Sequence, residues 1–132
     1  MIGGTGNDRY FVRDAGDRVI EWANSVDNDW VHAFVPNTDR DFRENYCYQL
    51  PDHVENVRLA GEAFRAFGNK LDNEMVGNDA NNYFNGKAGA DEMRGLYGDD
   101  RYVVDHVGDR IVEYANQGED IVVIFLDELL PA

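Results

Sequence analysis

Glycine and aspartate recur at fixed spacing in the second half of this 132-residue sequence. The segments 86–94 (GKAGADEMR) and 95–103 (GLYGDDRYV) carry glycine at positions one and four, aspartate at position six and a large apolar or aromatic residue at position eight. The glycines and aspartates are Gly86, Gly89 and Asp91 in one segment, and Gly95, Gly98 and Asp100 in the other. Glycine permits positive φ angles that turn carbonyl oxygens toward the carboxylate. Such all-oxygen sets suit Ca²⁺, so we expect Asp91 and Asp100 to be calcium ligands.

These nine-residue units, called nonamers below, also occur upstream. A run of four contiguous nonamers spans residues 68–103, and a fifth stands alone at 3–11 (GGTGNDRYF). Position six is Asp8 in the isolated nonamer, and Asn73 and Asn82 in the first two nonamers of the run. Because an asparagine amide carries no charge, we expect the sites that contain these two residues to bind calcium weakly or to stay vacant.

The sequence also repeats over a longer distance. Residues 4–24 (GTGNDRYFVRDAGDRVIEWAN) return as residues 96–116 (LYGDDRYVVDHVGDRIVEYAN). Matched residues include Asp8 with Asp100, Tyr10 with Tyr102, Asp17 with Asp109 and Glu21 with Glu113. A fixed internal period indicates a repeat architecture. We expect one domain over residues 1–132, with strand-turn-strand sections at 12–67 and 104–126.

Position eight of each nonamer is the candidate core residue. A short strand at the end of the nonamer would point this side chain inward and its two neighbours outward. If two nonamers complete one coil, alternate nonamers stack, which places Met75 under Met93 and Phe84 under Tyr102. Burial of each large side chain contributes about 1.5 to 3 kcal/mol, which hardly offsets the cost of ordering a whole nonamer. We therefore expect calcium ions to hold the turns together.

Outside the nonamers, alternating apolar residues predict strands at 29–35 and 54–59. The polar segment 36–45 predicts a surface loop. Residues 61–67 are the only stretch in which a helix is worth considering. We expect three aromatic side chains of the connecting sections to lie in the core, namely Trp22, Trp30 and Tyr114.

Composition limits the function. The chain has 26 acidic and 12 basic residues, and its net charge of −14 argues against binding to nucleic acid or to anionic membranes. Its single cysteine, Cys47, can form no internal disulfide, and no apolar stretch is long enough to span a bilayer. The histidines are scattered, and neither His-Glu-x-x-His nor Gly-x-Ser-x-Gly occurs. We expect a chain that binds cations and is not an enzyme.

The nonamers resemble the repeats of the RTX (hemolysin-type calcium-binding) family, whose pattern is Gly-Gly-x-Gly-x-Asp-x-U-x with a large apolar residue at U. Residues 3–11 match this pattern at every defined position. Two flanking segments, 48–61 (YQLPDHVENVRLAG) and 102–123 (YVVDHVGDRIVEYANQGEDIVV), resemble the connecting segments of long RTX arrays. The resemblance implies an all-β fold, a right-handed parallel β-roll or β-helix (solenoid). It also implies structural calcium and bacterial type I export to the extracellular space.

In the family, each ion is shared between one nonamer and the second nonamer after it. Extending the frame over residues 104–112 adds one more position-six residue, Asp109. The resulting pairs are Asn73 with Asp91, Asn82 with Asp100, and Asp91 with Asp109, of which only the last is fully acidic. Asp8 would need a partner from elsewhere in the chain.

Two alternatives remain open. An aspartate at position six can form a turn by accepting hydrogen bonds from its own backbone. The whole chain can also be a degenerate, metal-free solenoid that serves as a spacer or as an adhesion module. The nonamer at 3–11 has no preceding turn to stack on, which suggests neighbouring repeats of a longer chain or head-to-tail contacts between chains.

Overall fold

The computed structural model describes residues 1–14, 16–23, 27–34 and 48–125. The predicted loop at 36–45 and Cys47 lie outside these ranges. Every regular element in the described residues is a β-strand. The strands are β1 (Arg9–Val12), β2 (Trp30–Ala33), β3 (Tyr48–Gln49), β4 (Asn56–Leu59), β5 (Arg65–Phe67), β6 (Glu74–Val76), β7 (Tyr83–Asn85), β8 (Glu92–Arg94), β9 (Arg101–Val104), β10 (Arg110–Ile111) and β11 (Ile121–Ile124). Within these ranges there is no helix that could cross a membrane.

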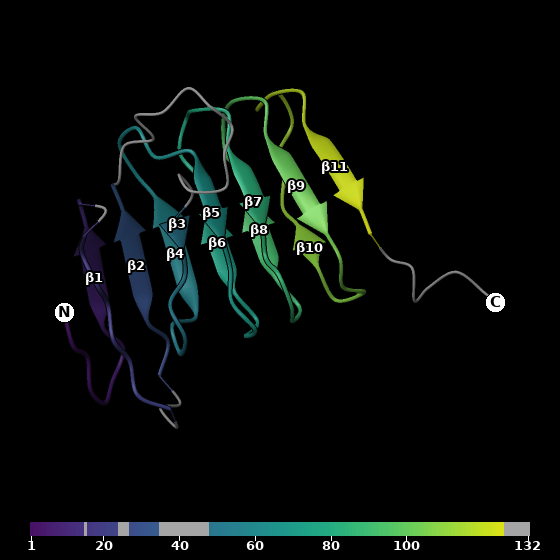
Figure 1. Cartoon of the computed structure of the whole chain (residues 1–132). Coiled ribbons are helices and arrows are strands. Elements are labelled where there is room, and N and C mark those ends of the chain that lie inside the picture. Colours follow the sequence, from purple (N-terminus) through teal and green to yellow (C-terminus); the bar gives the residue numbers. More distant parts are fainter. Residues whose placement is uncertain (15, 24–26, 35–47, 126–132) are drawn as a thin grey trace.

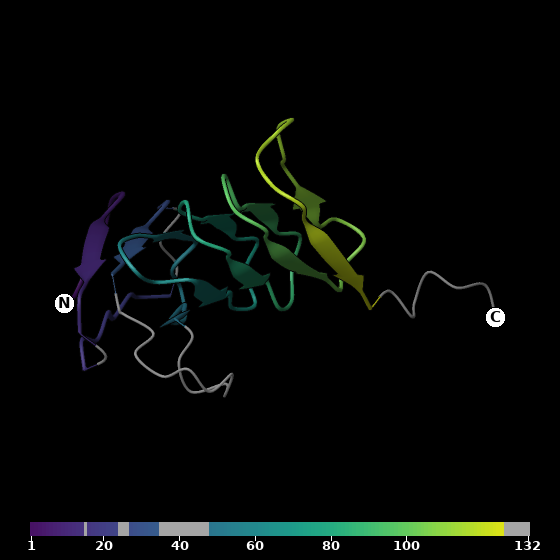
Figure 2. The ribbon, with the colours of Figure 1, turned by 90° about the horizontal axis from the view of Figure 1, so that it is seen from above.

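The strands form two parallel sheets that the chain visits in turn. The first sheet has the order β1-β2-β4-β6-β8-β10, and the second has the order β11-β9-β7-β5-β3. From β2 onward, consecutive strands alternate between the sheets, so the backbone coils along one axis (Figures 1 and 2). The prediction of an all-β parallel solenoid is confirmed.

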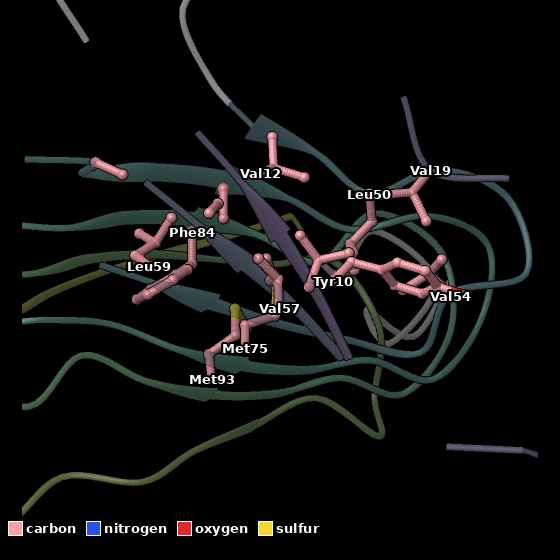
Figure 3. Close-up of a cluster of buried hydrophobic side chains, with 14 of the residues drawn as sticks. Tyr10, Val12, Val19, Leu50, Val54, Val57, Leu59, Met75, Phe84 and Met93 are labelled. Carbon is pink, nitrogen blue, oxygen red and sulfur yellow. The ribbon is translucent and has the colours of Figure 1, made fainter. Parts of the chain in front are cut away.

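The core lies between the two sheets and includes the position-eight side chains of the nonamers. In the register, Met75 pairs with Met93, and Phe84 pairs with Tyr102. All four side chains are buried, and the Phe84 and Tyr102 rings stack with centroids 5.9 Å apart. Figure 3 shows the aliphatic and aromatic side chains that continue this row toward the N-terminus. The stacking of alternate nonamers is therefore confirmed.

Two details differ from the sequence expectations. Residues 61–67 contain strand β5 instead of a helix, because Ala66 points into the core beside Phe84 in the parallel register. Trp22 and Tyr114 are 63% and 62% exposed, so they are not core residues. Each follows a glutamate that points inward, and alternation along an extended chain then directs the aromatic side chain to solvent.

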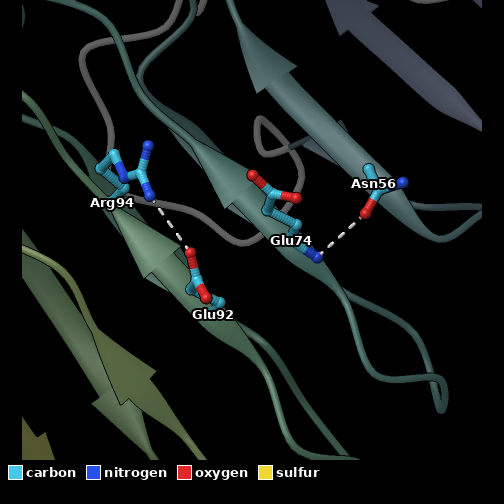
Figure 4. A network of polar contacts seen from close by, with 4 residues as sticks. All are labelled: Asn56, Glu74, Glu92 and Arg94. Carbon is cyan, nitrogen blue, oxygen red and sulfur yellow. Dashed lines mark hydrogen bonds and ion pairs between the residues drawn. The ribbon is translucent and has the colours of Figure 1, made fainter.

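Polar side chains occupy one row across strands β4, β6 and β8 of the first sheet, where Asn56, Glu74 and Glu92 are in register. Arg94 forms an ion pair with Glu92 at 3.2 Å, and the Glu74 backbone N–H donates to Asn56 Oδ1 at 3.3 Å (Figure 4). Glu74 and Glu92 are neighbours in the register of β6 and β8. The Arg94 guanidinium therefore partly neutralises a row of like charges, although such surface pairs contribute only about 0 to 1 kcal/mol.

Candidate metal sites

Position-six side chains form a column along each sheet, because each residue directly precedes a strand. The Asn73 backbone N–H donates to Asp91 Oδ1 at 2.8 Å, and the Asp91 N–H donates to Asp109 Oδ1 at 2.9 Å. In the second column, the Asn82 N–H donates to Asp100 Oδ1 at 2.7 Å. The structure therefore brings together all three pairs that the sequence predicts.

Glycine makes room for these carboxylates at position one of the turn. A Cβ atom at Gly86 would collide with Asp91 Oδ2, and one at Gly95 would collide with Asp100 Oδ2. At position four, the φ angles of Gly89 and Gly98 are 93° and 101°, values that favour glycine. The predicted glycines thus shape the turn around the position-six side chain.

Asn73 and Asn82 are hydrogen-bonded within their turns. The Asn73 amide nitrogen donates to the Glu55 carbonyl oxygen at 2.8 Å and to Asn69 Oδ1 at 3.0 Å. The Asn82 amide nitrogen donates to Asn78 Oδ1 at 2.8 Å. In both turns, the side-chain Oδ1 atom lies against the position-one glycine and accepts a backbone N–H, from Asn69 at 2.9 Å and from Asn78 at 3.0 Å.

Asp91 and Asp100 lack such a donor. Each side chain is 1% exposed, and each Oδ2 atom is buried without a hydrogen-bond partner. Burial, together with the neighbouring Asp109 carboxylate, raises the pKa of Asp91 from 3.8 to about 8. Burial likewise raises the pKa of Asp100 to about 6, with a contribution from Asp120. Both carboxylates would be stabilised by a proton or by a cation.

Asp109 has a different environment. Its Oδ1 atom accepts the Asp91 N–H, while Oδ2 accepts the N–H groups of Asp105 and His106, both at 3.0 Å. Asp17, its equivalent in the first copy of the long repeat, forms the same type of turn, and these backbone hydrogen bonds lower its pKa. The geometry at Asp109 therefore favours turn formation, one of the two readings that the sequence left open.

Among the described residues, the structure also assembles two groups of three carboxylates in which each residue offers an oxygen within 4.8 Å of the others. The groups are Asp8, Glu21 and Asp29, and Asp100, Glu113 and Asp120. Four of these residues, Glu21, Asp29, Glu113 and Asp120, were not predicted as site residues. The long repeat could have identified the two glutamates, because it returns both of them in the same phase as Asp8 and Asp100.

No family model, curated protein or solved structure matches this chain. The similarity to RTX repeats therefore remains a resemblance carried by the nonamers. What the geometry supports on its own is two partly buried groups of carboxylate oxygens with surplus negative charge.

Proposed function

We propose that this chain is a calcium-binding structural module in which bound Ca²⁺ holds stacked turns of the solenoid together. The observation that carries the proposal is the pair of convergent carboxylate groups, whose members include buried oxygens without partners, Asp29 Oδ2 and Asp100 Oδ2 among them. An ionised carboxylate is costly to bury unless it is paired with a positive charge. A bound cation would supply that charge.

The donor chemistry favours calcium over other metals. Each group consists of carboxylates alone, without histidine or cysteine, which disfavours zinc and other metals that prefer nitrogen or sulfur ligands. Ca²⁺ accepts six to eight oxygens in flexible geometry, whereas Mg²⁺ requires near-ideal octahedral geometry. Turns that combine carboxylates with backbone carbonyls match the calcium preference better.

Titration of the chelated chain with Ca²⁺ tests the proposal. A ligand that binds only the folded state stabilises it by mass action, so the melting temperature measured by calorimetry should rise with calcium concentration. Circular dichroism should report a gain of β-structure in parallel. Mg²⁺ at equal concentration is the control and should have a smaller effect. A melting temperature unchanged by millimolar calcium would contradict the proposal.

A second candidate function is that of a metal-free spacer or adhesion module. The hydrogen-bonded amides of Asn73 and Asn82 favour this second function, because they stabilise the middle turns without an ion. In this case, the chain would fold fully in excess chelator. Binding to a polysaccharide or protein array in chelator would distinguish an adhesion module from a spacer.

We also propose that the module is non-enzymatic and belongs to a secreted bacterial protein exported by a type I system. The resemblance of the nonamers to RTX repeats supports this setting. The acidic turns would remain disordered at low cytosolic calcium and would fold where calcium is abundant. The folded module would contact neighbouring repeats or a second chain. Export of the chain from a bacterium carrying a type I exporter, compared with a strain lacking it, tests the assignment.

A further inference from the structure

We infer that the two carboxylate groups are copies of one composite calcium site, in which a glutamate from a connecting section joins a position-six aspartate and a second aspartate that stacks on it. The sites are Asp8, Glu21 and Asp29 beside β1 and β2, and Asp100, Glu113 and Asp120 beside β9 and β11. They lie toward opposite ends of the solenoid (Figure 1). The inference rests on the proposed calcium binding and adds the residues that complete each site.

The site near the C-terminus joins three parts of the chain. The Asp100 backbone N–H donates to Asp120 Oδ1 at 2.8 Å, which stacks the two aspartates. The Tyr102 hydroxyl donates to Glu113 Oε1 and accepts the Gly95 N–H at 2.8 Å. Glu113 is thereby held against the turn, although it lies 13 positions after Asp100 in the sequence.

The site near the N-terminus repeats this arrangement. The Asp8 backbone N–H donates to Asp29 Oδ1 at 2.8 Å, and the Tyr10 hydroxyl donates to Glu21 Oε1. A Cβ atom at Gly3, the equivalent of Gly95, would collide with both of these side-chain oxygens. Two separate parts of the sequence therefore build the same contacts.

Buried oxygens without partners provide independent evidence for a ligand. Asp29 is 0% exposed, Asp100 is 1% exposed and Glu21 is 6% exposed. The atoms Asp29 Oδ2, Glu21 Oε2, Asp100 Oδ2 and Glu113 Oε2 are all buried without a hydrogen-bond partner. Buried polar atoms are normally satisfied. In each group, one glutamate oxygen and one aspartate oxygen, of Asp29 in the first group and of Asp100 in the second, are left unpaired in the same place, which matches a hard divalent cation.

Tyrosine at position eight distinguishes these sites from the other nonamers. The contiguous nonamers before Tyr102 have Met75, Phe84 and Met93 at this position, and none of these side chains can hydrogen-bond a carboxylate through a hydroxyl. Tyr10 and Tyr102 are each followed by the glutamate 11 positions later. The site therefore has a sequence signature, Asp-x-Tyr-x10-Glu-x6–7-Asp, in which tyrosine is a positioning residue.

Calorimetric titration of the full chain with Ca²⁺ tests this inference. Glu21→Gln and Glu113→Gln should each weaken one class of sites by about tenfold or more, and the double variant should weaken both. Glu74→Gln is the matched control, because it makes the same charge change at a strand residue outside both sites. Its affinities should stay within about twofold of those of the parent chain.

Two further variants show whether a loss of calcium affinity comes from the site itself or from a general loss of folding. Asp120→Asn keeps an oxygen that accepts the Asp100 N–H and removes only the charge, so it should lower the affinity of the same site as Glu113→Gln. Tyr102→Phe should weaken that site and reduce the calcium-induced rise in melting temperature. A purely structural role for Tyr102 would lower the melting temperature equally with and without calcium, and this result would contradict its assignment as a positioning residue.

The possible failures are distinguishable. A parent chain that binds no calcium would overturn the proposed function together with this inference. A parent chain that binds calcium, with unchanged affinities in the glutamate and Asp120 variants, would overturn the composite sites alone. In that case, calcium would belong to other turns, such as the one around Asp91.

Discussion

The turns in the middle of the solenoid and those toward its ends differ in how their buried asparagine and aspartate side chains are hydrogen-bonded. In the middle, Asn73 Oδ1 and Asn82 Oδ1 lie against the position-one glycine and accept a backbone N–H of the same turn, while their amide nitrogens donate to nearby oxygens. Toward the C-terminus, Asp91 Oδ2 and Asp100 Oδ2 lie at the corresponding place and have no partner, and Asp29 Oδ2 toward the N-terminus is also buried without one. An asparagine side chain, which both donates and accepts, is satisfied in this turn, whereas an ionised carboxylate, which only accepts, leaves an oxygen available to a cation.

This difference has consequences for stability along the chain. A buried polar atom without a partner costs about 1 to 3 kcal/mol, and more when it is charged. The turns of Asn73 and Asn82 avoid this cost, whereas those of Asp29, Asp91 and Asp100 need a proton or a cation. We therefore expect the part of the solenoid around β6 and β7 to fold independently of calcium and the parts around the buried carboxylates to depend on it.

Calcium removal should have the largest effect. Each calcium site adds about 2.7 kcal/mol of stability when free calcium is 100-fold above the dissociation constant. In chelator, backbone amides of β1, β2, β9 and β11 should lose hydrogen-exchange protection, while those of β4 to β7 keep it. Equal loss of protection in both regions would contradict the proposed difference between the two kinds of turn.

Asn82→Asp should convert a middle turn into an acidic one. The new oxygen would face Asn78 Oδ1, which now accepts the Asn82 amide, so the metal-free chain should lose about 1 to 3 kcal/mol in denaturant unfolding. Calcium should restore part of that loss. The exposed Asn81→Asp makes the same charge change and should cost much less. If both variants lost the same stability, net charge and not the turn would be responsible.

The metal-free chain should become less stable as pH rises. Asp91 has a pKa of about 8 in the folded state against an ordinary value of 3.8, so the folded chain holds more protons between these values. Asp100, with a pKa of about 6, acts in the same direction in the lower part of this window. Melting temperatures in chelator should therefore fall from pH 5 to pH 8. A rise over this range would show that the two carboxylates are not buried as described.

The smallest effect is expected on the outer face. Arg94→Ala removes the ion pair with Glu92 and should cost less than about 1 kcal/mol, because both side chains are partly exposed. The cost should be the same with and without calcium, as measured by chemical denaturation. A strong calcium dependence would mean that this face is coupled to the cation sites.

Much of the fold could be predicted from local spacing. The phase of glycine, aspartate and apolar residues in each nonamer predicted turns, short strands and the stacking of Met75 under Met93. The strand at residues 65–67 and the exposure of Trp22 could not be predicted with the same certainty. Both depend on which side of an extended chain meets the opposite sheet, and no motif marks that side.

Asp29, Glu113 and Asp120 are residues of the candidate sites that were not predicted from the sequence. The chain between Asp8 and Asp29, like the chain between Asp100 and Asp120, is not a whole number of nonamers long. The nonamer spacing therefore does not predict that the two aspartates of each pair lie together. Glu113 recurs with Glu21 in the long repeat, yet its role as a site residue depends on a hydrogen bond from the Tyr102 hydroxyl.

The sequence alone established the repeating turn and the inward position of the eighth residue in each nonamer, because glycine conformation and strand alternation are local properties. Only the tertiary structure decided which position-six side chains have a partner. Stacking brings distant segments into contact and removes water from between them, and an oxygen's need for a proton or a cation follows from that burial.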